Sequence, residues 1–401
     1  MINFRTSWAR ALRALGATLL LAVIGCGGGV ETGGTGPTGS SFVEGPVSGF
    51  GSVIVAGIRF DESNARVEDA DGTPRSRSEL RLGMRLEIDA GPVLDDSDGG
   101  RSASADRVRI VAELLAPVTL IGPSGLFIEV LGQVVRINAA TVIDGVAGGS
   151  APLAVGDVVE VHGFVDTASL VDGYVATRIE RRSTPPPAYR VRGLVRDLDP
   201  AARTLRIGTQ LFDLAATGVP AGLGNGQIAR LVVSTARASG RWPVQAISAV
   251  SRQLLDRDEA QVEGLITSFT NTARFEVNGI LIDASNASFV NGSAGVVRGA
   301  RVKVRGNAAC GVLVASSVAL RSDNDAFNEG VDIRDLIATV DSAAQTFTLR
   351  GITVFYGNAP RVDNGSLADL VNGVGRSVRV RGVLSADRTR VVASRIEFIN
   401  S

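Results

Sequence analysis

Few side chains in this chain of 401 residues could do chemistry, and its single histidine, His162, is the first candidate. A catalytic base needs an orienting partner and a nucleophile within reach, and the sequence around His162 supplies neither pattern. His162 ends the alternating segment 158–162, so we expect it on the solvent side of a strand. We therefore predict a protein that is not an enzyme and has no metal site or cofactor. Two carboxylates converging in a cleft, as in glycosidases, are the enzymatic alternative.

Two acidic segments could offer oxygen ligands to a cation. Asp95, Asp96 and Asp98 lie in a Gly-rich loop, where flexible carboxylates could hold Ca²⁺. Their spacing does not fit an EF-hand loop, because no glutamate follows at the position that binds the ion through both oxygens. The segment 323–329 is also acidic. We expect both segments to be solvated loops, and calcium binding at the first remains open.

Basic side chains alternate with valines in two segments near the C-terminus. A period of two places the charges on one face of a strand and the valines in the core. The basic residues are Arg301, Lys303, Arg305, Arg379 and Arg381. Two similar segments nearer the N-terminus carry Glu87 and Glu160 at the matching positions, which is the opposite charge. We therefore expect a solvated outer face, with glycan or polyanion binding as the alternative.

These candidate residues lie within a repeated phrase that organises most of the chain. It has the form Leu-x-x-Gly-x-x-Val-x-Val, with similar apolar residues exchanged. Its glycines are spaced 73, 70, 73 and 76 residues apart and are Gly83, Gly156, Gly226, Gly299 and Gly375. A hairpin signal precedes each copy, and Asn278-Gly279 between two apolar runs is the strongest of them. Self-similarity at a fixed period indicates a tandem array of one structural unit.

Each repeat contains four or five short strands and little with a helical period, apart from a possible helical turn at 366–371. We predict an all-β fold of five OB-like modules, because curling into a small barrel removes open sheet edges. A β-solenoid is the alternative. The Pro-rich segment 183–187 is expected to separate the first two modules from the other three. The predicted module boundaries are 42–115, 116–187, 188–257, 258–327 and 328–401.

This pattern resembles a bacterial domain family of unknown function that occurs as tandem copies in envelope lipoproteins. The resemblance covers about residues 42–401 and rests on the opening Gly-x-Val phrase, the hairpin and the Leu-x-x-Gly-x-x-Val-x-Val phrase. It implies an extracytoplasmic array of small β-barrels. It supplies no catalytic residues that could be carried over to this chain.

The N-terminal segment 1–25 has the organisation of a signal peptide. Three arginines precede the apolar stretch 14–24, which is too short to span a bilayer as a helix. The sequence Val23-Ile24-Gly25-Cys26 resembles the lipobox of bacterial lipoproteins. That resemblance implies cleavage before Cys26 and acylation of its thiol. Residues 26–41 are rich in Gly, Ser and Thr, which is typical of a flexible tether.

The remaining composition limits the partners and the location. Lys and Arg together number 41, as do Asp and Glu, and this zero net charge argues against a nucleic-acid partner. Cys310 is the only other cysteine, and we expect it to be a buried or half-buried small hydrophobe. Gly27 after Cys26 favours the outer membrane by the sorting pattern of lipoproteins. We predict a lipid-anchored envelope protein that binds or scaffolds a protein or glycan without catalysis.

Overall fold

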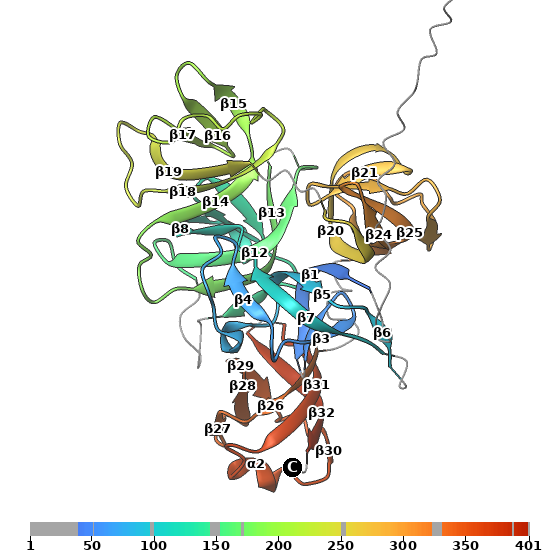
Figure 1. Cartoon of the computed structure of the whole chain (residues 1–401). Coiled ribbons are helices and arrows are strands. Elements are labelled where there is room, and N and C mark those ends of the chain that lie inside the picture. The colour runs from blue at the N-terminus through green and yellow to red at the C-terminus, as the bar shows by residue number, and fades with distance from the viewer. Residues whose placement is uncertain are drawn as a thin grey trace, which may run out of the picture. The chain divides into compact units, whose positions relative to one another are not determined.

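The described part of the chain is nearly all β, and most of its strands are short (Figure 1). All described residues belong to one compact unit, and no helix among them is long and apolar enough to cross a membrane. The predicted signal segment, Cys26 and most of the predicted tether lie outside the described residues. The computed structural model describes residues 39–50, 52–96, 100–144, 153–169, 172–249, 254–322, 331–386 and 389–399.

The stretch 114–181 shows how one repeat folds. Its elements are β8 (Leu114–Ile121), the 3-10 helix η2 (Pro123–Gly125), β9 (Phe127–Val130), β10 (Gln133–Arg136), β11 (Val142–Asp144), β12 (Val158–Asp166) and β13 (Gly173–Arg181). β8 pairs antiparallel with β9, and β9 pairs antiparallel with β10. β10 runs parallel to β13, β13 pairs antiparallel with β12, and β12 returns to β8. Five strands thus close into a barrel in the OB-like order, with β11 as an extra strand beside β13.

The same ring forms at the N-terminal end of the described chain. Its elements are β1 (Ser41–Phe50), β2 (Val53–Val55), β3 (Ile58–Asp61), β4 (Arg66–Asp69), η1 (Arg77–Glu79), β5 (Arg85–Ala90), β6 (Leu94–Asp95) and β7 (Arg101–Ile110). β1 pairs with β2, β2 with β3, and β3 runs parallel to β7. β7 pairs with β5, and β5 returns to β1.

The third repeat follows the same order with its first strand divided at Val195. Its strands are β14 (Tyr189–Leu194), β15 (Arg196–Asp199), β16 (Thr204–Ile207), β17 (Gln210–Asp213), β18 (Ile228–Val233) and β19 (Trp242–Ala249). The fourth has an undivided first strand of fifteen residues. Its strands are β20 (Arg257–Asn271), β21 (Arg274–Val277), β22 (Ile280–Asp283), β23 (Ser288–Val290), β24 (Arg301–Ala309) and β25 (Val312–Arg321). In both, the third strand of the ring runs parallel to the last.

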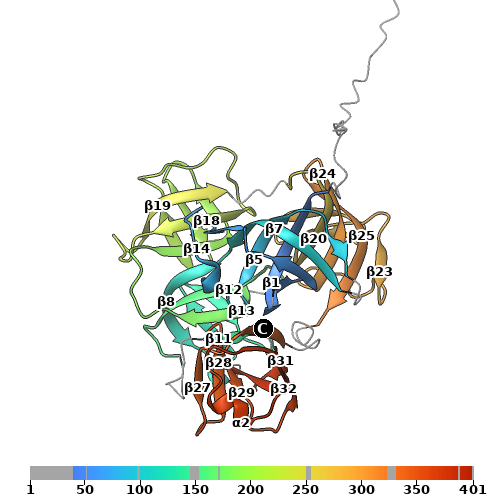
Figure 2. The same cartoon turned by 60° about the horizontal axis from the view of Figure 1, so that its bottom comes forward.

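The C-terminal repeat closes in the same way and contains the short α-helix α2. Its elements are β26 (Val331–Leu336), β27 (Thr339–Asp341), β28 (Thr346–Leu349), β29 (Ile352–Phe355), β30 (Arg361–Asp363), α2 (Ala368–Val371), β31 (Ser377–Leu384) and β32 (Arg390–Phe398). Figure 2 shows α2 beside the strands of this barrel, and it confirms the helical turn predicted at 366–371. The prediction of an all-β chain of small OB-like barrels is confirmed. The β-solenoid alternative is wrong, because the strands close into separate rings.

The glycines of the repeated phrase have one structural role. All of them have a positive φ, between 77° and 95°, which residues with a Cβ rarely adopt. Each also donates its backbone N–H to a carbonyl oxygen within or directly after the first strand of its barrel: Gly83 to Val47, Gly156 to Val118, Gly226 to Val195, Gly299 to Ile266 and Gly375 to Ile337. This contact lies where the first strand leaves its pairing with one neighbour and turns to the other. The repeated glycine therefore sets the bend that lets the sheet close.

The repeats do not stand apart from one another. β1 runs parallel to both β20 and β26, and β8 pairs antiparallel with β14. One apolar core joins residues of the first and C-terminal barrels, and another joins the second and third. The expectation that segment 183–187 separates the second module from the third is therefore wrong. β14 begins two residues after the last of these prolines, and its pairing with β8 and the shared core hold the two barrels together.

Candidate functional site

The basic strand face of the fourth repeat is occupied by ion pairs. Arg301 on β24 bonds to Glu263 on β20, with 2.7 Å between the guanidinium and carboxylate atoms, and Arg305 lies 3.1 Å from Glu259 on the same strand. Lys303 is half-buried directly opposite Glu263 in the β20–β24 pairing. Arg301 is only 7% exposed, so it does not belong to a solvated outer face as expected.

The corresponding face of the C-terminal repeat is also paired. Arg379 and Arg381 on β31 both reach Asp332 on β26, at 2.6 and 3.4 Å. Carboxylates on the neighbouring strand thus neutralise much of the positive charge that the sequence predicts for these two strand faces. Polyanion binding through these two faces stays a prediction.

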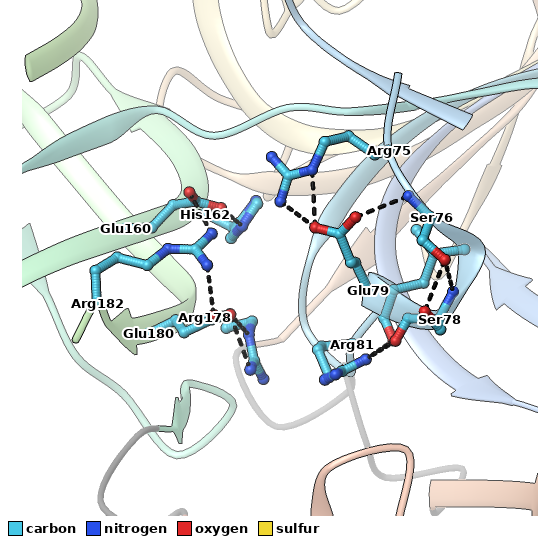
Figure 3. Close-up of polar contacts among 11 residues, drawn as sticks. Arg75, Ser76, Ser78, Glu79, Arg81, Glu160, His162, Arg178, Glu180 and Arg182 are labelled. Carbon is cyan, nitrogen blue, oxygen red and sulfur yellow. Dashed lines mark hydrogen bonds and ion pairs between the residues drawn. The ribbon is translucent and has the colours of Figure 1, made fainter. Parts of the chain in front are cut away.

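His162 is not on the surface, contrary to the sequence-based expectation. Its side chain is fully buried, and Nδ1 lies 2.9 Å from the carbonyl oxygen of Val111. Nε2 lies 3.1 Å from a carboxylate oxygen of Glu160, two residues earlier on β12 (Figure 3). Since both partners are acceptors, the ring satisfies both only when both nitrogens carry hydrogen. The alternation failed here because a neighbouring segment covers the outer face of the strand.

Glu160 connects this histidine to a further arginine. Its carboxylate accepts a hydrogen bond of 2.6 Å from Arg182 through the oxygen that does not contact His162 (Figure 3). Burial alone would raise the pKa of Glu160, but the hydrogen bond and charge of His162 and the charge of Arg182 outweigh it. They hold the pKa well below its usual value. Glu160 therefore stays ionised as a structural partner of His162 and Arg182.

Two other expectations concern loops and a cysteine. Asp96 accepts a hydrogen bond from Ser102 and pairs with Arg59, and Asp95 lies beside Arg101; Asp98 and the segment 323–329 lie outside the described residues. Within the described part of the chain, no cluster of His, Cys, Asp or Glu could hold a metal ion.

Cys310 is exposed rather than buried, because Cys310 and Gly311 both have positive φ and form the turn between β24 and β25.

The most unusual chemistry lies in a buried ion cluster that the sequence analysis missed. We define it as Glu44, Arg85, Glu113 and Arg192. Arg85 pairs with Glu44 of its own barrel and with Glu113 at the start of the next repeat, and all three side chains are fully buried. Glu113 also accepts a hydrogen bond of 2.7 Å from Arg192 of the third repeat. Asn278 of the fourth repeat donates to Glu44 over 2.9 Å. Three successive repeats therefore supply the charges of this cluster, and the fourth supplies a neutral hydrogen-bond donor to it.

The electrostatics of the cluster are balanced. Burial would lower the pKa of Arg85, but the charges of Glu44 and Glu113 outweigh it, so the pKa is raised and the group stays protonated. Two carboxylates face two guanidinium groups, as buried charges require. Tyr174 lies close to the cluster, where burial and then the charge of Glu113 raise its pKa well above the usual value.

A sequence signal for this cluster exists in the comparison of repeats. Arg85 stands two residues after Gly83, and Glu44 comes directly before the opening glycine of its repeat. The fourth repeat has Arg301 and Glu263 at the same two positions, and they also form a buried ion pair. Aligning the repeats residue by residue would have predicted one pair from the other.

A pocket of about 770 Å³ lies between loops of the second and fourth repeats. We call it the arginine pocket, because its lining includes Arg136, Arg298, Arg301 and Arg321. Of the predicted ligand-binding residues, Arg301 alone lines this pocket; Lys303, Arg305, Arg379 and Arg381 do not. Beside it, the Thr167 hydroxyl of the second repeat donates a hydrogen bond of 2.7 Å to the carbonyl oxygen of Thr267 on β20 of the fourth repeat.

Comparison with known proteins agrees with the repeated fold. The model of a domain described as "Domain of unknown function (DUF5666)" matches residues 117–180, 263–319 and 336–397. Each matched segment begins in the first strand of a barrel and ends in or close to its last strand. No curated protein matches the chain. Three segments of the chain are thus similar to a domain of unknown function, which agrees with its repeated fold.

Proposed function

We propose that this chain is a cell-envelope lipoprotein that acts without catalysis, as a tethered array of small β-barrels for binding or scaffolding. The observation that carries this proposal is the use of its buried ionisable side chains. Arg85, Glu113 and Arg192 join three repeats, and His162 is enclosed by Val111 and Glu160. Groups held in such contacts fix the positions of the barrels and are not accessible to a substrate.

The proposed location in the cell envelope rests on the N-terminal sequence. The lipobox-like run that ends at Cys26 supports acylation of that thiol, and Gly27 supports the outer membrane as its destination. Two or more acyl chains hold a protein on a bilayer far better than one, since each buried CH₂ adds about 0.8 kcal/mol. A Gly-rich tether would keep the barrels clear of the lipid headgroups.

Metabolic labelling with an alkyne palmitate tests the anchor. The wild-type protein should incorporate the label and sediment with outer membranes, whereas Cys26→Ser should do neither. Cys310→Ser is the matched control, because it removes the chain's other cysteine and should leave labelling unchanged. Equal labelling of Cys26→Ser would remove the lipid anchor from the proposal.

In-cell crosslinking with mass spectrometry tests the binding role. We expect crosslinks from the barrels to one defined envelope protein or glycan, reduced in cells that make the Cys26→Ser variant. Crosslinks that vary at random between preparations would contradict scaffolding. Hydrolysis of an envelope glycan by the purified protein would overturn the non-catalytic role itself.

A further inference from the structure

We propose that the arginine pocket binds a small amphiphilic anion, a molecule with a carboxylate head on an apolar body. This inference goes beyond the proposed scaffolding role and is independent of the lipid anchor. The volume of about 770 Å³ lies within the range of about 300–1,000 Å³ that is usual for small-molecule sites. The pocket therefore suits a ligand of this size and is too small for a folded partner.

The charge of the lining favours an anion. Four arginines line the pocket, and Asp166 is the one acid among the described residues that do so. Arg136 pairs with Asp166, and Arg301 pairs with Glu263. Arg298 donates its Nε–H to the Thr167 hydroxyl over 3.1 Å, and no carboxylate of the described residues pairs with it. Its terminal nitrogens are therefore available to a carboxylate, which a guanidinium binds through two parallel hydrogen bonds.

A second polar group at this site is also incompletely satisfied. Arg301 is nine-tenths buried, and its Nε–H has no acceptor within the described part of the chain. A buried donor without a partner is unfavourable and uncommon in folded proteins. Because this Nε is itself buried, Arg301 contributes positive charge to the wall of the pocket rather than an open Nε–H donor.

The apolar part of the ligand follows from two exposed side chains in the lining. Leu126 is 59% exposed and Val297 is 50% exposed, although both are aliphatic. They come from different repeats, and Val297 directly precedes Arg298. An apolar body would cover these side chains while the acid head reached the arginine, and burying them is favourable in proportion to their area.

The walls of the pocket are held in place by close contacts. A Cβ added at Gly299 would lie 2.4 Å from the Cβ of Ala168, so the loops of the second and fourth repeats approach each other as closely as glycine allows. The Thr167 hydroxyl donates to the carbonyl oxygen of Thr267 at this place and accepts from Arg298. Arg298 is thus positioned by the same threonine that joins the second repeat to β20 of the fourth.

Fluorescence titration of the purified protein with 11-(dansylamino)undecanoate tests the proposal. We expect saturable binding at one site per chain and displacement of the probe by decanoate. Decyltrimethylammonium, which has the same chain length and the opposite charge, should displace it at least tenfold less well. Equal displacement by the cation would show that only apolar surface is recognised and would overturn the proposal, as would absence of binding.

Variants assign the binding to the pocket. Arg298→Gln should weaken probe binding about tenfold or more, the usual effect of removing a hydrogen bond to a charged group. Arg298→Lys should keep part of the affinity, and Val297→Ser should weaken binding through the apolar part. Arg305→Gln is the control, since Arg305 lies on β24 outside the pocket, and it should bind as the wild type does. Unchanged affinity in Arg298→Gln, with an unchanged thermal unfolding midpoint, would overturn the assignment.

Discussion

Replacing Arg85 by methionine tests whether the buried ion cluster stabilises the assembly of repeats. Arg85 is fully buried between Glu44 and Glu113, which are fully buried themselves. Without it, Glu113 keeps Arg192 at 2.7 Å, whereas Glu44 loses the guanidinium of Arg85 and keeps a hydrogen bond from the neutral amide of Asn278. Removing one partner of a buried ion pair costs about 3–5 kcal/mol. We expect Arg85→Met to lose that amount of unfolding free energy.

A second substitution separates the effect of charge from loss of packing. Arg85→Met combined with Glu44→Gln restores charge balance, since Glu113 and Arg192 then remain as one pair. We expect the double variant to be more stable than Arg85→Met alone by about 1–3 kcal/mol, because the buried carboxylate that lost its guanidinium partner is gone. Arg379→Met is the control: it breaks a partly exposed ion pair and should cost less than about 1 kcal/mol.

Urea unfolding followed by far-ultraviolet circular dichroism, with calorimetry in parallel, measures these differences. Because several barrels could unfold in steps, the calorimetric trace shows whether one free energy describes the transition. The reasoning is refuted if Arg85→Met costs less than about 1 kcal/mol. It is equally refuted if the double variant is as unstable as the sum of its single substitutions.

Three further predictions concern single side chains. The lowered pKa of Glu160 means that its contribution to stability is present above its unfolded pKa of about 4.3 and is lost as the pH falls towards the folded-state value. Glu160→Gln should therefore be less stable than wild type at pH 7 by about 1–3 kcal/mol. The difference between the urea midpoints of the two proteins should become smaller as the pH falls from 5 to 3. A difference that stays constant would contradict this prediction. In thermal unfolding, Gly83→Ala should destabilise the protein more than Gly156→Ala. Both glycines have positive φ, and placing an alanine in that backbone conformation costs about 1–2 kcal/mol at either position. Only at Gly83 would the new Cβ also lie 2.5 Å from the carbonyl oxygen of Thr177. Equal losses would mean that this contact relaxes freely. Tyr174→Phe should leave the unfolding free energy unchanged within about 0.5 kcal/mol or raise it, because the buried hydroxyl has no hydrogen-bond partner among the described residues; a loss above 1 kcal/mol would reveal one.

The barrel fold was predictable because its determinants are local. Asn278 and Gly279 both have positive φ, as the hairpin signal between two apolar runs requires, and Gly83 and its equivalents bend the chain at the predicted positions. Each of these residues acts mainly through its own backbone conformation. Such signals survive in a single sequence and recur at the spacing of the repeats.

The contacts between barrels were not predictable in the same way. Asn278 and Glu44 are 234 residues apart, and Arg192 and Glu113 are 79 apart, so no local pattern links them. His162 was misplaced for the same reason, because the carbonyl of Val111 that covers it comes from another segment. Alternation along a strand tells which residues point away from one core, but a second barrel or segment can cover that outer face.

Hydrogen–deuterium exchange of the purified protein tests most directly whether the repeats are joined through this cluster. The backbone N–H of Arg192 donates to Glu113, and that of Glu113 donates to Val161, each over 2.8 Å. We predict that both amides are protected as long as the strands of the barrel cores, and that Arg85→Met shortens their protection at least tenfold while the β16–β17 hairpin is unaffected. Exchange of the Glu113 and Arg192 amides within seconds in the wild-type protein would contradict the account.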